Sequence, residues 1–209
     1  MLPDRLERQL AYLDAHPECV AVGARVLAMD ADGTPLRVLI REFTHEEIDG
    51  AHLDGRGGAL GNPTATFRAD AARRIGGYRD ELRTTGEDHD FWLRLAEVGR
   101  LANLPDVLVR YRMHDRNASL DAADRERRHA VTRDTLARAY ERRGIRDRDA
   151  AKRPLPPPRR AERWRDAALL SHFRGQSLRA VAHAVGAALL EPASPSVRYA
   201  LRAVLGRIR

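Results

Sequence analysis

The segment Gly86-Glu-Asp-His-Asp-Phe-Trp-Leu-Arg-Leu95 joins an acidic start to an apolar side that repeats at helical spacing. The apolar residues that share one face of such a helix are Phe91, Leu95 and Val98. Gly99 follows at a position where helices commonly end. The segment therefore predicts a helix over residues 87–98.

Three carboxylates, Glu87, Asp88 and Asp90, fall in the first turn of this predicted helix. Free N–H groups and the helix dipole stabilise negative charge there, so a single acidic residue would be explained by capping alone. Three acids in four positions exceed what a cap needs, and like charges this close raise one another's pKa. The pattern favours a carboxylate that acts as a base next to a substrate.

Two strands joined by a turn are predicted before this segment, after an opening helix over residues 3–15. Residues 19–29 are rich in valine and alanine, and residues 35–40 form a second β-like run. Between them, Asp30-Ala-Asp-Gly33 predicts a turn, because Asp-Gly is a turn signal between strands. This interpretation is favoured over a metal-binding Asp-x-Asp pair.

The rest of the first 120 residues is predicted to alternate short helices and strands. Thr44-His-Glu-Glu47 has the pattern of a capping box and starts a helix. Pro105 separates two β-like runs. The remaining predicted elements are a strand at 64–67, a helix at 69–75, and strands at 101–104 and 107–111. Residues 1–120 are therefore predicted to form an α/β part.

The C-terminal half changes in composition. Residues 121–150 predict a basic amphipathic helix, and residues 151–160 contain four prolines that predict a stiff linker. Residues 161–209 predict a helical module. Its three predicted helices cover 161–174, 177–190 and 196–208.

The composition fits a folded domain with anionic partners. The chain has 209 residues, of which 43% are hydrophobic and 32% charged, enough to bury a core. Its 37 basic and 30 acidic residues give a net charge of +7, with Lys152 the only lysine. Few aromatics, 5%, and interleaved acids argue against a nucleic-acid partner. The single cysteine, Cys19, excludes an internal disulfide framework and a cysteine-based metal site.

The sequence predicts a cytoplasmic location, with peripheral contact at the inner membrane face as a further expectation. The charged start lacks the apolar region of a signal peptide. The longest apolar stretch, residues 180–190, is far shorter than the roughly 20 residues of a membrane span. Clustered basic residues predict either a solvated surface or docking on an anionic membrane. These are Arg125, Arg127, Arg128, Arg142, Arg143 and residues 152–165, with Trp164 among them.

Four motifs follow one another in the chain: Gly61-Asn-Pro-Thr-Ala-Thr-Phe-Arg68, Ile75-Gly-Gly-Tyr-Arg79, Gly86 to Leu95, and Leu104-Pro-Asp-Val-Leu-Val-Arg-Tyr-Arg-Met-His114. This ordered series resembles the second half of family 2 glycosyltransferases with the GT-A fold. The opening, Leu2-Pro-Asp-Arg-Leu-Glu-Arg-Gln-Leu-Ala-Tyr-Leu13, is similar to the middle of that family. The resemblance covers residues 1–118 and implies a nucleotide-diphospho-sugar transferase fold followed by a helical extension.

The resemblance also implies an activity and roles for single residues. It implies a hexosyltransferase-type enzyme that moves a sugar, with inversion, from a nucleotide-sugar donor to a saccharide or lipid-linked acceptor, as in polysaccharide biosynthesis. Asp88 would be the general base, and Glu87 would orient the acceptor or the base. His114 would help to hold Mn²⁺ or Mg²⁺, for which a neutral imidazole is a suitable ligand. The candidate acceptor-binding residues are Asn62, Thr64, Asp90 and Trp92.

Other interpretations stay open for several of these residues. Trp92 also fits a core position, Asn62 and Thr64 also fit turn and strand positions, and His114 also fits a turn after a strand. Relatives begin with a donor-binding half that ends in Asp-x-Asp, whereas Met1 stands where that motif has already passed. The chain alone is therefore expected to be N-terminally truncated, to bind donor and metal poorly, and to be inactive by itself. The alternative is a non-catalytic remnant or interaction module that pairs with another transferase chain.

Overall fold

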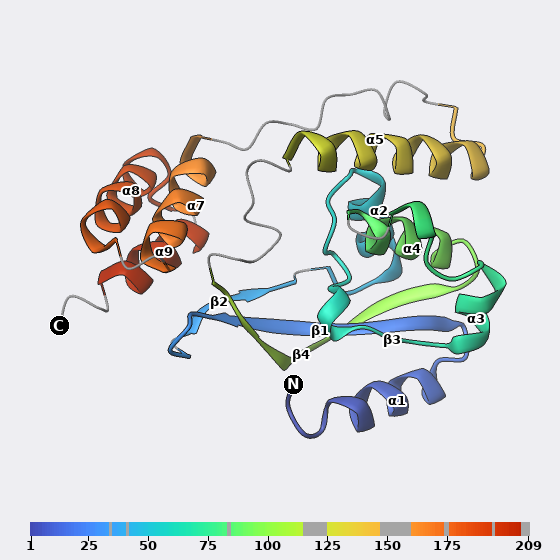
Figure 1. The fold of residues 1–209 in the computed structure, drawn as a ribbon. Coiled ribbons are helices and arrows are strands. Elements are labelled where there is room, and N and C mark those ends of the chain that lie inside the picture. Colours follow the sequence, from blue (N-terminus) through green and yellow to red (C-terminus); the bar gives the residue numbers. More distant parts are fainter. Residues whose placement is uncertain are drawn as a thin grey trace. The chain divides into compact units, whose positions relative to one another are not determined.

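Strand β1 (Cys19–Met29) organises the sheet, because β2 (Pro35–Leu39), β3 (Thr66–Phe67) and β4 (Arg100–Arg112) all pair with it. The computed structural model describes residues 1–33, 35–40, 42–82, 85–114, 125–146, 160–173, 176–193 and 195–205. Strand β3 is antiparallel to β1, with Ala21 opposite Phe67. The predicted α/β class is confirmed (Figure 1).

Strand β4 runs in the same direction as β1. The Arg100 amide donates to the Glu18 carbonyl at one end, and the Met113 amide donates to the Met29 carbonyl at the other. The prediction of two strands separated by Pro105 is wrong, since one strand of 13 residues passes through it. Pro105 is exposed, and a proline is tolerated in a strand where its missing N–H is not needed by a neighbour.

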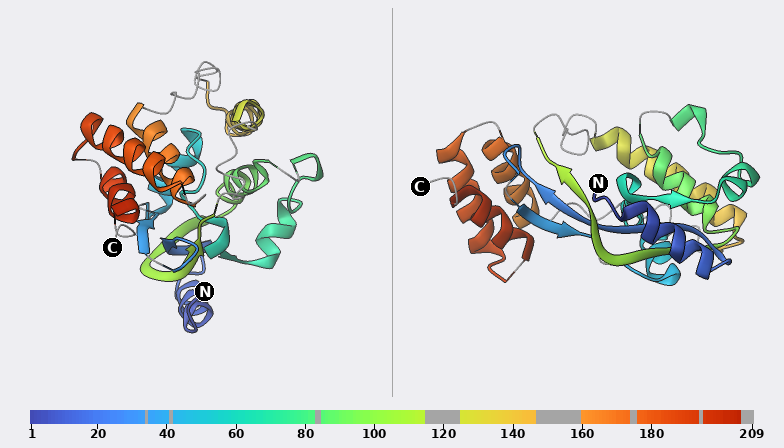
Figure 2. Two further views of the ribbon diagram at one scale, coloured as in Figure 1. Left: turned by 60° about the vertical axis from the view of Figure 1, so that its left-hand side comes forward. Right: turned by 90° about the horizontal axis from the view of Figure 1, so that it is seen from below.

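Helices cover both faces of the sheet (Figures 1 and 2). Helix α1 (Arg5–Ala15) lies on one face, and α2 (His45–Leu53) and α4 (Glu87–Leu95) lie on the other. The core between α1 and the sheet comprises Leu13, Cys19, Val22, Ala24, Ala102, Leu104 and Leu108. The core below α2 and α4 includes Val20, Ala21, Ile48, Leu60, Phe91, Trp92, Leu95 and Leu101. Short elements connect them: η1 (Asn62–Thr64), α3 (Ala69–Arg74) and η2 (Asp80–Leu82).

Local signals in the sequence explain where α2 begins and how α1 is fixed. The predicted capping box at the start of α2 is confirmed, with the Thr44 side chain accepting from the Glu47 amide and the Glu47 carboxylate accepting from the Thr44 amide. On α1, the fully buried Gln9 donates to the carbonyls of Val22 and Thr64, at 3.0 and 2.8 Å. A buried amide with all its groups paired ties α1 to the sheet in one register.

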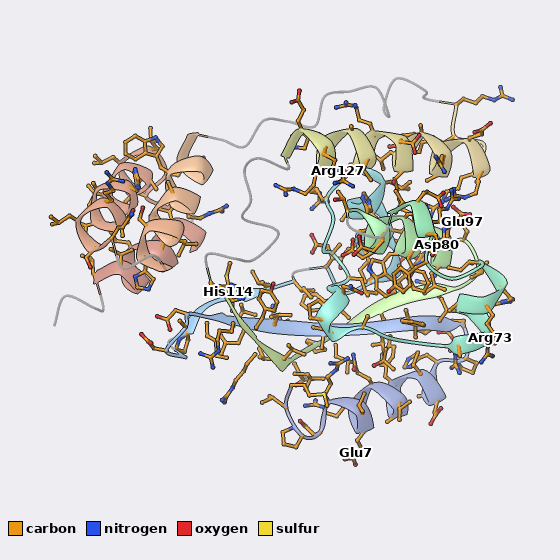
Figure 3. The ribbon with its side chains drawn as sticks, in the orientation of Figure 1. Glu7, Arg73, Asp80, Glu97, His114 and Arg127 are labelled. Atoms are coloured by element: carbon orange, nitrogen blue, oxygen red, sulfur yellow. The ribbon has the colours of Figure 1, made fainter. Side chains whose placement is uncertain are left out.

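Helix α5 (Arg125–Arg142) packs against α2 and α4 through Leu136, Ala139 and Tyr140. The Tyr140 hydroxyl donates to the Leu53 carbonyl at 2.7 Å. Two arginines that the sequence offered as membrane contacts are instead used inside the fold. Arg142 pairs with Glu97 at 2.9 Å, and Arg143 pairs with Asp49 at 2.7 Å. Glu97 is labelled in Figure 3, beside α5.

The chain divides into two compact units. The first comprises residues 1–26, 39–109 and 123–155, and the second comprises residues 27–38, 110–122 and 156–209. In the second unit, α7 (Arg160–Phe173), α8 (Ser177–Leu190) and α9 (Pro195–Leu205) pack on one another. Their shared core comprises Ala168, Ala180, Ala184 and Val204. The proline-rich linker predicted for 151–160 lies outside the described residues, apart from Arg160.

Small residues allow the three helices of the second unit to approach closely. Trp164 lies against Gly186, and its ring meets the His183 ring edge to face at 5.6 Å between centroids. Trp164 therefore packs inside this unit, although the sequence analysis placed it among the candidate membrane-contacting residues. No helix within the described ranges combines the length and apolar character that crossing a bilayer would require.

The turn after β1 is tied to α7 within the second unit. Asp30 accepts from the Asp32 amide at 3.0 Å, which closes the predicted turn, and Gly33 has a φ of 91°. The other Asp30 carboxylate oxygen lies 3.4 Å from Nε2 of His172, and both side chains are buried. The predicted turn is therefore confirmed, and Asp30 also contributes to packing in this unit.

Candidate active site

The start of α4 carries the first two candidate residues. Gly86 precedes the helix with a φ of 75°, a left-handed conformation that favours glycine. A Cβ at this position would lie 2.8 Å from the Val131 side chain of α5, so the approach of that helix also requires glycine. The chain therefore enters α4 in one fixed direction, and Glu87 and Asp88 occupy its first two positions.

Asp88 is partly buried at the helix start. Its Oδ1 accepts a hydrogen bond from the His89 amide at 2.7 Å. Within the part of the chain that the structure describes, no ion pair engages this carboxylate. A partly exposed carboxylate that no described cation engages meets the geometric requirement for a base within reach of a substrate hydroxyl.

Tyr78 joins these carboxylates from the turn after α3. Tyr78 is 43% exposed, and its ring stacks on Phe91 with 4.2 Å between centroids. Its hydroxyl donates to Oδ1 of Asn62 at 3.4 Å. Burial, and then the negative charges of Asp88 and Glu87, raise the pKa of the Tyr78 hydroxyl. The structure thus groups Asn62, Tyr78, Glu87 and Asp88, which we call the acidic cluster with its tyrosine.

Tyr78 was not among the residues selected from the sequence. It lies in the motif Ile75-Gly-Gly-Tyr-Arg79, where both glycines have positive φ, 79° and 69°. Two left-handed glycines reverse the chain and present the next side chain beside the start of α4. An aromatic residue directly after a double glycine was the available signal.

Asp90 has a different environment from its two acidic neighbours. It is 1% exposed, and its Oδ2 lies 2.7 Å from Arg94 and 3.3 Å from Arg79. Arg94 also donates to the Ile75 carbonyl at 2.7 Å. The carboxylate therefore joins α4 to the turn that carries Tyr78. Its burial counts against direct acceptor binding, and we do not include Asp90 in the proposed acceptor site.

Two further candidates, Thr64 and Trp92, are also buried. Trp92 is 1% exposed and packs edge to face on Phe91, as its alternative interpretation as a core residue predicted. The Thr64 hydroxyl donates to the Gly61 carbonyl at 2.7 Å and accepts from the Ala24 amide at 3.2 Å. Asn62, in contrast, is exposed. Of the four acceptor-binding candidates, Asn62 alone is exposed.

Two buried histidines, His52 of α2 and His89 of α4, lie next to each other. His89 Nε2 lies 2.8 Å from the His52 carbonyl, and the two rings are 5.5 Å apart. Burial and the neighbouring His89 lower the pKa of His52 to about 3, and burial also lowers the pKa of His89. Both rings are therefore neutral near pH 7 and add no positive charge next to Asp88.

His114 belongs to the second unit, whereas the acidic cluster belongs to the first. It is exposed, two residues beyond the end of β4 (Figure 3). Within the described ranges, no three His, Cys, Asp or Glu side chains are grouped so that they could hold a metal ion. The described residues therefore do not form a metal site by themselves, and His114 stands as a single candidate ligand.

About half of the chain is similar to known glycosyltransferases. It is 35% identical over 116 residues to the amylovoran biosynthesis glycosyltransferase AmsE of Erwinia amylovora, a match that spans 53% of this chain and 40% of AmsE. It is 34% identical over 113 residues to EpsE of Bacillus subtilis, which is named a glycosyltransferase, spanning 53% of this chain and 38% of EpsE. A glycosyltransferase of Haemophilus influenzae is 28% identical over 109 residues, spanning 52% and 39%.

The three matches agree in kind and in extent. All three relatives are named glycosyltransferases. The chain spans about two fifths of the length of each relative. No family model matches the chain.

Proposed function

We propose that this chain carries the acceptor side and the catalytic base of an inverting, family 2 type glycosyltransferase with a GT-A fold. The observation that carries the proposal is the acidic cluster with its tyrosine, in which a carboxylate, an aromatic ring and an amide lie together at the protein surface. The motifs of the sequence and the named relatives support the same activity. The substrates would be a nucleotide sugar and a saccharide or lipid-linked acceptor.

Asp88 would act as the general base in this reaction. As an acceptor hydroxyl approaches the anomeric carbon of the donor sugar, Asp88 takes its proton. The new bond joins the acceptor oxygen to the anomeric carbon, and the bond from that carbon to the nucleotide breaks. The nucleoside diphosphate leaves with the bonding electrons, and attack from the opposite side inverts the anomeric centre.

The neighbouring residues would hold the acceptor. The Tyr78 ring offers an exposed apolar face, against which the C–H groups of a sugar can pack. The Asn62 amide and the Glu87 carboxylate can hydrogen-bond to sugar hydroxyls. Asn62 accepts a hydrogen bond from the Tyr78 hydroxyl, and the negative charge of Glu87 acts on that hydroxyl. This arrangement would orient one hydroxyl toward Asp88.

The proposed reaction also includes a divalent cation. Mn²⁺ or Mg²⁺ would neutralise the charge of the departing diphosphate when bound. His114 is the residue proposed as one of its ligands. Because the described residues do not assemble a metal site, no step attributed here to the side chains of this chain depends on the ion.

A second candidate function is a non-catalytic module that pairs with another transferase chain. It is the alternative that the sequence analysis left open. The two functions differ in what they require of Asp88. A catalytic chain needs this carboxylate, whereas a pairing module needs only the folded surface.

The experiment replaces Asp88 in the chromosome of the cell that makes the chain. For Asp88→Asn we expect the same loss of surface polysaccharide as for deletion of the whole chain. Losing a general base lowers a rate by roughly 10²- to 10⁴-fold, whereas asparagine still accepts the His89 hydrogen bond. The measurement is the sugar composition and amount of surface polysaccharide, alongside the circular dichroism of the purified variant.

The matched control is Asp54→Asn, which removes an exposed carboxylate of the same unit. This variant is expected to match the wild type. If Asp88→Asn also matches the wild type while deletion abolishes the polysaccharide, the chain acts as a pairing module and the base assignment is wrong. If deletion leaves every surface glycan unchanged, the proposed function itself is wrong.

A further inference from the structure

Helix α8 has two apolar faces, and only one of them is covered. Its buried face is made of alanines that pack in the core of the second unit: Ala180, Ala184 and Ala187. The opposite face is exposed and is formed by Leu178, Ala182, Val185 and Leu189. Leu178 and Leu189 are 89% and 81% exposed. We call these four residues the α8 stripe.

The spacing of the α8 stripe shows that its exposed side chains lie along one side of the helix. The four residues recur at intervals of four, three and four positions, which places them in one row along a helix. No charged or polar side chain interrupts the row. The opposite face of α8 already packs in the core of the second unit, so a second, open apolar row marks an interaction surface.

The charge of the chain is concentrated around this helix in the sequence. Residues 151–209 contain 12 arginine and lysine residues and three acidic residues, a formal charge of +9. Residues 1–150 carry 25 basic and 27 acidic residues, a formal charge of −2, and the two parts account for the chain's +7. Within α8, Arg179 is exposed beside the stripe. The part of the chain with the apolar row therefore carries all of the excess positive charge.

The exposed apolar row and the positive charge around it together indicate which kind of partner binds the α8 stripe. A second copy of the chain would bring the same +9, and like charges oppose its approach. A row of four side chains on 14 residues is also small beside the roughly 1,000 Å² or more of a stable protein interface. An anionic lipid surface accepts both features, since leucines enter the acyl boundary while arginines meet the headgroups.

We propose that the α8 stripe docks the chain on an anionic lipid bilayer, with α8 lying in the plane of the surface. A helix of 14 residues is about 21 Å long, short of the roughly 30 Å hydrocarbon core, so contact along its side is the mode that fits its length. The proposal is independent of the chemistry assigned to Asp88, because it concerns the other unit.

The test is flotation of the full chain with lipid vesicles. We expect binding to vesicles of phosphatidylcholine with about a third phosphatidylglycerol, and weak binding to phosphatidylcholine alone. Replacing both leucines, in Leu178→Gln/Leu189→Gln, should lower the apparent partition constant by about tenfold or more. Glutamine is a good helix former and both positions are exposed, so the fold should persist, as circular dichroism would show.

The matched control makes the same change on α1 of the first unit. Leu6→Gln/Leu10→Gln removes two other exposed leucines and is expected to bind vesicles as the wild type does. Equal binding by both double variants would overturn the stripe assignment, as would failure of the wild type to bind anionic vesicles. The proposal is also overturned if light scattering shows a dimer that Leu178→Gln/Leu189→Gln converts to a monomer, because the stripe would then hold a second copy.

Discussion

Tyr78 is the residue whose role can be tested most directly by substitution. It combines a partly exposed side chain with a hydroxyl near two carboxylates. Tyr78→Phe keeps the ring and removes the hydroxyl, so we expect acceptor saccharides to bind about 3- to 10-fold more weakly. Tyr78→Ala also removes the stacking surface and should weaken binding by more than tenfold. The measurement is an NMR titration of the chain with a panel of glycosides.

Tyr12 provides the control for this comparison. It also stacks on a neighbour, the His16 ring at 4.1 Å, but it lies on α1. Tyr12→Ala should leave saccharide affinity unchanged. If glycosides shift the resonances of Asn62 and Glu87 in the wild type and equally in Tyr78→Ala, then Tyr78 does not form part of the acceptor surface.

The buried His52 ring predicts a specific loss of stability in acid. Its pKa is about 3 in the folded chain, against about 6.5 in an unfolded one. Between these values the unfolded state binds more protons, so the free energy of unfolding falls as the pH falls below about 6.5. From about pH 7 to about pH 5, His52 alone should account for about 2 kcal/mol of this loss.

Urea denaturation of the wild type and His52→Met at both pH values measures this contribution. The variant lacks the titrating ring, so its loss of stability on acidification should be smaller by about the amount that His52 contributes. His16→Met, at a partly exposed histidine, is the control and should lose stability as the wild type does. Identical pH dependence in His52→Met and the wild type would mean that the ring is protonated, or solvated, in the folded chain.

For single residues, the sequence predicted where a side chain lies along a helix better than it predicted the burial and the partners of that side chain. The acidic start of α4 was predicted, and Glu87 and Asp88 lie there. The fate of Asp90 was not predictable from α4 alone, because one of its partners, Arg79, comes from a separate turn. Tyr78 escaped notice because its closeness to Asp88 depends on how that turn folds back.

The turn that carries Tyr78 is held to α4 by Asp90, and this link is a property of the two elements rather than of one residue. Asp90→Asn keeps the shape of the side chain but leaves the nearly buried Arg94 guanidinium without its counter-charge. We expect the free energy of unfolding to fall by about 3 kcal/mol. We also expect the Tyr78 ring resonances to shift, because the turn loses one of its attachments to the helix.

Asp134→Asn tests whether this loss is particular to a buried pair. Asp134 pairs with Arg138 at 2.9 Å on α5, with both side chains largely exposed. Exposed pairs contribute little, so this variant should lie within about 0.5 kcal/mol of the wild type. Equal effects of the two substitutions would show that Asp90 is solvated and does not anchor the turn.

The elements themselves followed from periodicity and capping, with one instructive exception. The capping box at Thr44 and the amphipathic α5 were predicted, since their signals are local. The continuous β4 was not predicted, because whether a proline ends a strand depends on its neighbours across the sheet. Pro105 is exposed and the strand passes through it.

For the whole molecule, the sequence predicted how charge is distributed but not how each charge is used. The basic character of the C-terminal part follows directly from the numbers of its basic and acidic residues. Which arginines remain available depends on packing: Arg142 and Arg143 pair with carboxylates of the first unit, and Trp164 packs inside the second. His114 and Asp88 also fall in different units, which the order of the motifs did not reveal.

The role of His114 as a ligand can therefore be tested apart from catalysis. Paramagnetic Mn²⁺ broadens the NMR resonances of residues that bind it, so titration of the chain should broaden the His114 imidazole first, because neutral imidazole binds such ions. In His114→Ala, broadening of the neighbouring Met113 resonances should disappear. His129→Ala, at a histidine of α5, is the control and should leave the broadening at His114 unchanged. If Mn²⁺ broadens the same region with and without the His114 ring, the residue is no ligand, and its place beyond β4 reflects the turn that its alternative interpretation predicted.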